Sequence, residues 1–313
     1  MEHFSDRGHG DLLLDRRWLK RQVVTWRTLA LVAMTVLATV LALRFIGGDH
    51  QPGLTGAPHI ARLAITGVIR SDQNLLDEID SLTHNTNVLG VVLRLDSPGG
   101  TYAGSEALYS ALTALSSAKP TVAVIDGVAA SGAYMAAIAS NHIVARAGSI
   151  TGSVGVIMQM PNLKGLLDHI GVGFEAVRSA PLKATPNPFE ETSSASREAA
   201  TAIVQDLFSQ FVGLVATRRQ LAPDQMELVM SGRIFTGNQA LPLGLIDAIG
   251  GEAMAMKWLR QQPNIPVDVK IIDASPDSEE VPLKKLIEQL TGTRLFGAQP
   301  MLDGPLALWQ AGL

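Results

Sequence analysis

The sequence predicts an α/β domain with a largely parallel sheet, preceded by one membrane-spanning helix. Two observations predict this arrangement. From residue 61 onward, short apolar runs alternate with helical segments, which is typical of parallel α/β folds. Before them, residues 28–45 form an almost unbroken apolar run whose only charge is Arg44, and a run of this length can cross a bilayer.

The apolar run is interpreted as an uncleaved anchor with its N-terminal side in the cytoplasm. Five basic residues precede it between Arg16 and Arg27, whereas Gly47, Gly48 and Asp49 follow it. A cleaved signal peptide is the alternative, but a lead of this length before the apolar run is unusual, and no clean cleavage site follows. We therefore expect a cytoplasmic tail at 1–27, a transmembrane anchor at 28–46, a linker at 47–60, a catalytic domain at 61–271 facing the periplasm or exterior, and a C-terminal extension at 272–313.

The elements of the domain are expected in alternating order. Apolar runs bounded by polar or glycine-rich stretches predict strands at 61–66, 89–95, 121–125, 142–145, 154–158, 174–178 and 245–249. Between them, amphipathic stretches predict helices at 73–83, 103–116, 131–140 and 194–219, the last entered through Ser193 or Ser194 as N-cap. The polar, acidic residues 272–281 predict a loop before the apolar tail at 295–313.

The amino-acid composition excludes several kinds of binding and catalytic site. The 313 residues carry a formal net charge of −4, and no basic surface indicates nucleic-acid binding. There is no cysteine, so disulfides, thiolate metal sites and a cysteine nucleophile are excluded. We expect no metal and no cofactor.

Two glycine-containing segments each follow a predicted strand and precede a predicted helix. In the first, Gly99 and Gly100 end the segment SPGG, and their N–H groups are able to stabilise an oxyanion; a plain tight turn is the alternative. In the second, small residues surround Ser131 in AASGAY, as a nucleophile at a sharp turn requires. The alternative for Ser131 is a simple helix N-cap.

A serine nucleophile needs a base. Among the histidines of the domain, His84, His142 and His169, none stands in a recognisable triad context. Lys183 lies among apolar and proline residues, where desolvation lowers the pKa of an ammonium group and makes it a base; a solvated loop lysine is the alternative. Ser153, in the turn TGSVGV, is a candidate to orient that lysine or a plain turn residue.

Four blocks in order resemble peptidase family S49, the signal peptide peptidase A family, in its short single-domain form. The blocks are SPGG at 97–100, AASGAY at 129–134, TGSVGV at 151–156 and GRIFTGNQALPLGLID at 232–247. The resemblance implies a Ser/Lys dyad of Ser131 and Lys183, an oxyanion hole at Gly99 or Gly100, and support of the lysine by Ser153.

The resemblance also implies a fold and a setting. The fold would be the crotonase and Clp-protease type of stacked ββα units, assembled into a ring-shaped homo-oligomer on the outer face of the cytoplasmic membrane. The substrates would be remnant signal peptides and other short or unfolded polypeptides. Two alternatives are an acyl-CoA enzyme of the crotonase fold, for which Asp96 and Asp126 are the acids near the key turns, and a catalytically silent membrane-tethered scaffold ring.

Overall fold

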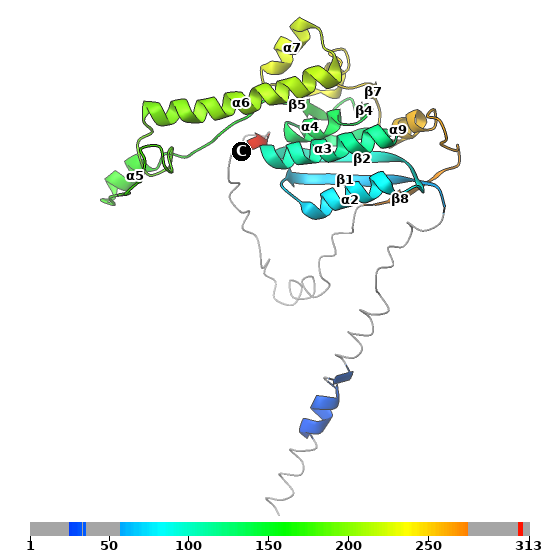
Figure 1. The fold of residues 1–313 in the computed structure, drawn as a ribbon, viewed down its shortest axis with the longest axis horizontal. Coiled ribbons are helices and arrows are strands. Elements are labelled where there is room, and N and C mark those ends of the chain that lie inside the picture. The colour runs from blue at the N-terminus through cyan, green and yellow to red at the C-terminus, as the bar shows by residue number, and fades with distance from the viewer. Residues whose placement is uncertain (1–24, 33, 36–56, 275–305, 309–313) are drawn as a thin grey trace, which may run out of the picture. The chain divides into compact units, whose positions relative to one another are not determined.

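The computed structural model describes residues 25–32, 34–35, 57–274 and 306–308 (Figure 1). The chain divides into two compact units, Met1–Thr55 and Gly56–Leu313. In the first unit, residues 25–32 and 34–35 are helical, and the side chains of Leu29 and Met34 are 61% and 63% exposed. The remainder of the expected anchor lies outside the described residues.

The second unit is built on one mixed sheet that contains nine strands within the described residues. Its centre is formed by three long parallel strands: β1 (His59–Ile69), β2 (Val88–Thr101) and β3 (Thr121–Ala130). Shorter strands extend the sheet on both sides: β4 (His142–Ala145), β5 (Ile150–Gly152), β6 (Ile234–Thr236), β7 (Ala248–Ile249) and β8 (Lys270–Asp273). A ninth strand, β9 (Leu306–Leu308), pairs with β2. The predicted mixed α/β class is confirmed.

Both faces of the central strands are buried, and alternation along each strand divides the core in two. On β2, Leu93 and Leu95 point to the larger cluster, while Val92 points to the smaller one. Side chains of β3 alternate in the same way, with Ala123 in the larger cluster and Val124 in the smaller. This two-sided burial explains why the strands read as continuous apolar runs in the sequence.

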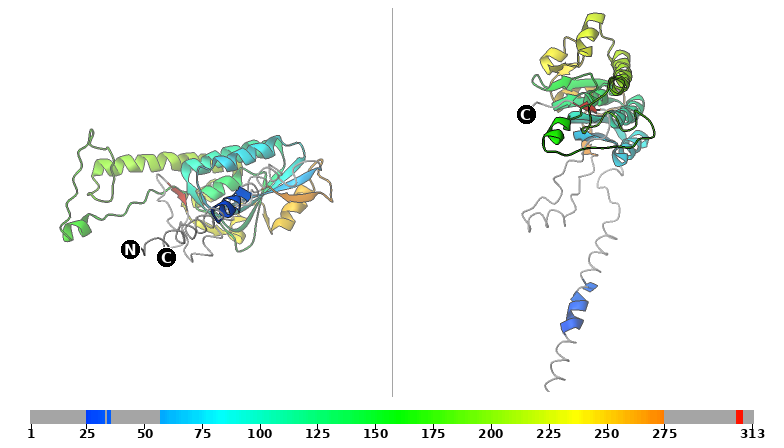
Figure 2. Two further views of the ribbon diagram at one scale, coloured as in Figure 1. Left: turned by 90° about the horizontal axis from the view of Figure 1, so that it is seen from below. Right: turned by 90° about the vertical axis from the view of Figure 1, so that its left-hand side faces the viewer.

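Helices cover both faces (Figures 1 and 2). The larger cluster lies under α2 (Gln73–His84), α3 (Tyr102–Ala118) and α4 (Gly132–Ile138), with part of α6 (Ser194–Arg219) beside them. The smaller cluster packs under α9 (Glu252–Leu259). Two short helices, α7 (Pro223–Met230) and α8 (Gly237–Ala240), complete the domain.

A long arm projects from the domain (Figures 1 and 2). It consists of the segment 157–193, which includes α5 (Lys164–His169), together with the first half of α6. Many apolar side chains of the arm are exposed, among them Ile157, Met160, Leu163, Leu166, Ile170, Val172, Phe174, Val177, Leu182, Phe189 and Ile203. The arm therefore offers an apolar surface that the single chain does not cover.

Among the described residues, α6 is the one helix long and apolar enough to cross a membrane. Its C-terminal half packs against the domain, because Phe211 and Val215 are fully buried. Arg218 further donates hydrogen bonds to the carbonyl oxygens of Ile138 and Ala139, at the end of α4. These contacts attach the C-terminal half of α6 to the domain.

Four expectations about elements are wrong. The runs at 154–158 and 174–178 are not strands. The first follows β5, which ends at Gly152, and buries Val154 and Val156 in the core, whereas the second belongs to irregular, largely exposed chain. The expected strand at 245–249 is reduced to β7, because Leu245 and Ile246 serve as core side chains outside the sheet. The expected loop at 272–281 begins too early, since β8 runs to Asp273 and pairs with β1.

Candidate active site

Ser131 lies at the junction between β3 and α4, in a strained backbone conformation. Its φ is 55° and its ψ is −121°, a region that costs a residue with a side chain about 1–3 kcal/mol. The turn is held in place because the Ser131 N–H donates to the carbonyl oxygen of Gly152 at 2.8 Å. The hydroxyl does not cap α4, so the alternative of a simple N-cap is not what the structure shows. A strained serine between a buried strand and a helix is the geometry of a nucleophile elbow.

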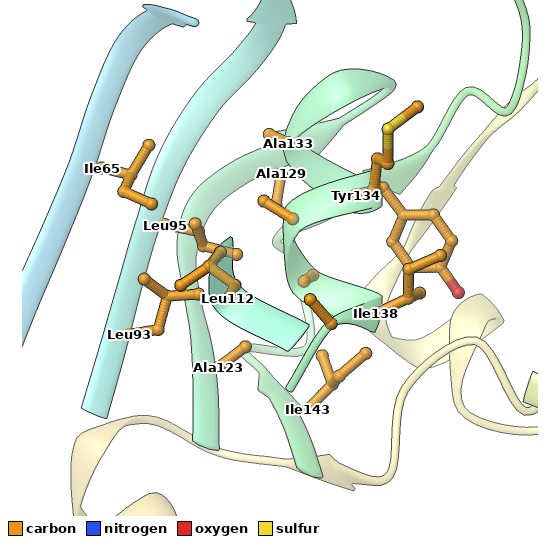
Figure 3. Packing of buried hydrophobic residues seen from close by; sticks show 14 of the residues in the cluster. Ile65, Leu93, Leu95, Leu112, Ala123, Ala129, Ala133, Tyr134, Ile138 and Ile143 are labelled. Atoms are coloured by element: carbon orange, nitrogen blue, oxygen red, sulfur yellow. The ribbon is translucent and has the colours of Figure 1, made fainter. Parts of the chain in front are cut away.

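The helix that follows Ser131 is fixed by the core. Every residue of α4 is buried, and Figure 3 shows Ala133, Tyr134 and Ile138 packed among the side chains of the central strands. The Tyr134 hydroxyl donates to the carbonyl oxygen of Leu245 at 3.0 Å, and burial raises the pKa of Tyr134, which keeps it a neutral donor. Ser131 is thus held at the start of a rigid helix, and its residue is only 1% exposed.

The SPGG block lies beside the strand that carries Ser131. Contrary to the expected turn after a strand ending at residue 95, β2 continues through the block to Thr101, with an irregularity after Leu95. Ser97 pairs with Ala129, two residues before the serine. A side chain at Gly100 would place its Cβ 1.7 Å from the carbonyl oxygen of Ile69, so only glycine fits there.

The two glycines differ in their hydrogen bonding. Gly99 has a φ of 103°, which glycine tolerates, and its N–H donates to Ser97 Oγ at 3.1 Å. That N–H group is therefore already engaged, whereas no such side-chain acceptor is present at Gly100 within the described contacts. Gly100 is paired in the sheet with Ile69 on one side and with Ala307 on the other.

Ser153 is connected to Ser131 through one residue. Gly152 accepts the Ser131 N–H, and the Ser153 N–H in turn donates to the carbonyl oxygen of Arg233 at 2.9 Å. Both residues have positive φ, and a Cβ at Gly152 would meet the Phe235 ring at 2.7 Å. The structure therefore brings Ser131, Ser153 and the SPGG block together, and it adds Gly152 as a positioning residue that the sequence offered only as a turn glycine.

Sequence comparison adds an independent observation. Residues 113–266 match the profile of Peptidase family S49. A Synechocystis protein that carries the name of a protease is 35% identical over 235 residues, which covers 74% of this chain and 83% of that protein. Such identity over most of both chains decides the family. The chain belongs to peptidase family S49.

Other relatives of this S49 peptidase extend across kingdoms. A Methanocaldococcus jannaschii protein, also named as a protease, is 30% identical over 243 residues, covering 73% of this chain and 78% of that one. The chloroplastic serine protease SPPA of Arabidopsis thaliana is 31% identical over 254 residues, covering 74% of this chain but 37% of that protein. The chain is thus a serine peptidase, and the predicted family and enzyme class are confirmed.

Lys183 lies on the arm of this S49 peptidase, in a turn closed by its own N–H, which donates to the carbonyl oxygen of Ala180 at 3.0 Å. Its side chain is exposed, and within the described residues its ammonium group has neither a hydrogen bond nor an ion pair. The desolvation expected from the apolar sequence around Lys183 is therefore not supplied by the chain itself. No described contact brings Lys183 to Ser131.

The loop that carries Lys183 is closed by a polar clamp at its base, formed by Arg178, Asn187 and Glu190. Arg178 Nη2 lies 2.7 Å from Glu190 Oε1. Asn187 Nδ2 donates both to Glu190 Oε2 at 3.0 Å and to the carbonyl oxygen of Ala184, the residue after the lysine, at 3.2 Å. The hydrogen bonds from Arg178 and Asn187 lower the pKa of Glu190, so the clamp is charged at neutral pH.

None of the three histidines is placed to serve Ser131. His142 pairs with Val122, near the start of β3, whereas Ser131 follows the end of that strand, about 25 Å further along at the usual strand rise. His142 instead stacks on Trp258, with ring centroids 5.0 Å apart. His84 ends α2 beside Asp80, and His169 ends α5 on the arm.

The acids near the two turns have structural partners. Asp96 Oδ1 accepts the N–H of Val128 at 3.0 Å, and Asp126 pairs with Arg94 at 2.6 Å. Within the part of the chain that the structure describes, no group of three or more potential ligands gathers as a metal site.

Proposed function

We propose that this S49 peptidase is a membrane-anchored endopeptidase in which Ser131 is the nucleophile and Lys183 the general base. The observation that carries the proposal is the conformation of Ser131: a strained turn, fixed by Gly152, holds a hydroxyl that caps no helix. Proteins retain such strain where a side chain must be presented for function. The confirmed peptidase family supplies the reaction class.

The proposed mechanism assigns one role to each group. Neutral Lys183 takes the proton of Ser131 as Oγ attacks a peptide carbonyl, and the protonated lysine then donates to the leaving amine. The oxyanion is stabilised by backbone N–H groups. Gly100 supplies one, with Gly99 beside it, and Gly132 supplies another, because the first N–H groups of a helix have no partner within it. Water then releases the acyl group with the same lysine as base.

The base requires a second copy of the chain. Lys183 is exposed in the single chain, and an ammonium group becomes a base at neutral pH only when it is desolvated. The uncovered apolar side chains of the arm, which surround Lys183 in the sequence, are suited to packing against another subunit. A ring-shaped homo-oligomer in which the arm of one subunit reaches the Ser131 site of the next, with Ser153 supporting the lysine, meets both requirements.

The substrates are proposed to be remnant signal peptides and other short or unfolded polypeptides. Ser131 is almost fully buried, so a folded protein surface cannot reach its hydroxyl, and we expect the site to admit only an extended chain. The neighbours Ala129, Ala130 and Gly132 are small and apolar, which favours small or aliphatic side chains beside the cleaved bond. The anchor at 28–46 would hold the domain on the outer face of the cytoplasmic membrane.

The two alternatives are less well supported. An acyl-CoA enzyme would need Asp96 or Asp126 as a free acid, and both are engaged by other groups. A catalytically silent scaffold would not require a serine in a strained conformation whose hydroxyl does not cap the following helix. Peptide hydrolysis is therefore the function that the site supports best.

The test is peptide hydrolysis by the full-length protein in detergent. We expect Ser131→Ala to lose activity by at least about a thousandfold, and Lys183→Ala by about a hundredfold or more. The matched controls are Ser110→Ala, an exposed serine of α3, and Lys164→Ala, an exposed lysine of the arm; both should keep native activity. Full activity of folded Ser131→Ala would refute the nucleophile, and full activity of Lys183→Ala would refute the base.

A further inference from the structure

Strand β3 is interrupted by a bulge shortly before the serine turn. The regular pairing of β2 with β3 ends with Leu95 opposite Ile125. It resumes with Ser97 opposite Ala129, so β2 advances by two residues where β3 advances by four. The extra residues of β3 form a β-bulge at 126–128. Because an even number of residues is inserted, Ala129 still points into the larger core cluster, as Ile125 does (Figure 3).

The bulge is also the place at which β3 changes its partner on the side away from β2. Up to Ile125 this partner is β4, and from Val128 onward it is β5. The pairing with β5 reaches Ala130 opposite Gly152, and the next N–H group, that of Ser131, donates to the carbonyl oxygen of Gly152. The hydrogen bond that holds the serine turn is therefore the last bond between β3 and β5, whose pairing begins at the bulge.

Two side chains bind main-chain groups of the bulge from opposite sides. From the β2 side, Asp96 Oδ1 accepts the N–H of Val128 at 3.0 Å. From the β5 side, the buried hydroxyl of Ser149 lies 2.8 Å from the carbonyl oxygen of Ile125 and 2.9 Å from that of Asp126. Main-chain polar groups need such partners where regular strand pairing is interrupted. The bulge is thus held between a carboxylate and a hydroxyl.

Asp96 connects this bulge with the SPGG block. It directly precedes Ser97, whose Oγ accepts the N–H of Gly99. Its carboxylate reaches the neighbouring strand three residues before Ser131. A Cβ at Gly127 would lie 2.7 Å from Asp96 Oδ1, so glycine leaves room for the carboxylate at this position. Asp96 is therefore attached to both parts of the proposed site, by the chain on one side and by a hydrogen bond on the other.

The hydrogen bond of Asp96 is exposed to solvent. The residue is exposed, whereas Leu95 and Ser97 on either side of it are buried. An exposed hydrogen bond competes with water and adds little to the stability of the fold. We therefore expect loss of the carboxylate to change the position of the serine turn more than the free energy of unfolding.

We propose that Asp96 is a positioning residue for peptide hydrolysis. Its carboxylate oxygen holds the bulge through Val128 and thereby sets the place of the Ser131 hydroxyl relative to the glycines of the SPGG block. Asp96 acts as a hydrogen-bond acceptor, so a neutral acceptor of the same shape should replace it. This inference deepens the proposed function and rests on it, since it assumes that peptides react at Ser131.

The first experiment compares Asp96→Ala with Asp96→Asn in the full-length protein. Asparagine keeps an oxygen that accepts the N–H of Val128, whereas alanine removes it. With a peptide substrate, we expect Asp96→Ala to lower kcat by roughly tenfold at a KM within about twofold of native, and Asp96→Asn to keep at least about half of native kcat. Native kcat in Asp96→Ala, or an equal loss in both variants, would overturn the proposal.

A control variant separates positioning from stability. Asn141 Oδ1 accepts the N–H of Thr121 at 2.8 Å, which is the same kind of bond at the opposite end of β3. In chemical denaturation, we expect Asn141→Ala to lose at least as much stability as Asp96→Ala, and yet to keep native kcat. If kcat falls in step with stability in both variants, Asp96 only supports the fold and the proposal is wrong.

Amide hydrogen exchange separates this inference from the proposed function. Exchange of the Ser131 amide is measured at residue resolution in Asp96→Ala and in Asp96→Asn. We expect faster exchange in Asp96→Ala alone, because the bond from Ser131 to Gly152 depends on the bulge. Unchanged exchange in Asp96→Ala would overturn the coupling, whichever residue is the nucleophile. Faster exchange together with full activity of Ser131→Ala would leave the coupling in place and refute the proposed nucleophile instead.

Discussion

At the scale of single residues, the site depends on backbone positions where a side chain is either strained or excluded. Ser131 and Ser153 both adopt positive φ, and they are joined through Gly152. Gly100 is closer to its neighbouring strand than any residue with a Cβ permits. Such positions fix atoms to within a few tenths of an ångström, which catalysis by oriented N–H groups requires.

Gly100→Ala tests this tight approach. The new Cβ would lie 1.7 Å from the carbonyl oxygen of Ile69, so β1 and β2 must separate, and we expect the free energy of unfolding to fall by about 3 kcal/mol or more. Chemical denaturation measures the change. The control is Gly148→Ala, where a Cβ would have no neighbour within 4 Å, and a change within about 0.5 kcal/mol is expected. Equal stability of the two variants would contradict the geometry.

At the scale of elements, the domain and the arm are stabilised differently. The helix α4 is held by apolar burial on all sides, so it presents Ser131 rigidly. The loop that carries Lys183 has little buried surface and is closed instead by the clamp of Arg178, Asn187 and Glu190. The proposed nucleophile is therefore fixed by the fold, whereas the position of the proposed base depends on polar contacts.

Glu190→Gln tests the clamp. Loss of the carboxylate removes the charged hydrogen bond to Arg178, so we expect faster limited proteolysis between residues 178 and 190 and a fall in kcat of about three- to tenfold at unchanged melting temperature. Because the clamp lowers the pKa of Glu190, its contribution is present above the ordinary carboxylate pKa and disappears as the pH falls through the lowered value. The adjacent Glu191→Gln is the control; if it has the same effect, the clamp has no specific role.

At the scale of the whole molecule, the single chain brings together only some of the proposed catalytic groups. Ser131, Gly100 and Ser153 converge at one edge of the sheet, while Lys183 lies on the projecting arm. The apolar side chains exposed along the arm are the surface on which a second copy is expected to pack.

Mixing two inactive variants tests the shared site. Equal amounts of Ser131→Ala and Lys183→Ala are dissociated and reassembled together. If each site combines Ser131 of one subunit with Lys183 of its neighbour, the mixture should recover about a quarter of native activity, because that fraction of sites has both groups intact. Each variant treated alone in the same way is the control. If the mixture remains as inactive as its components, the base comes from the same chain.

The sequence by itself determined the family, the enzyme class, the parallel α/β domain and the position of Ser131 after a buried strand. These features follow from local signals: apolar runs mark buried strands, Ser193 caps α6 as expected, and small residues mark a close approach to a hydroxyl. The order of the four short blocks along the chain is recognisable without any tertiary contact.

Only the tertiary structure decided which groups meet. The pairing of Gly99–Thr101 with Leu306–Leu308, the contact between Gly152 and Ser131, and the polar clamp below Lys183 all join residues through backbone or side-chain geometry that local composition does not encode. The strands expected at 154–158 and 174–178 fail in different ways. Val154 and Val156 are buried in the larger core cluster without forming a strand, whereas the apolar side chains of 174–178 remain on the exposed arm. Apolar character predicts that a residue will be covered, but not whether its own chain or another covers it.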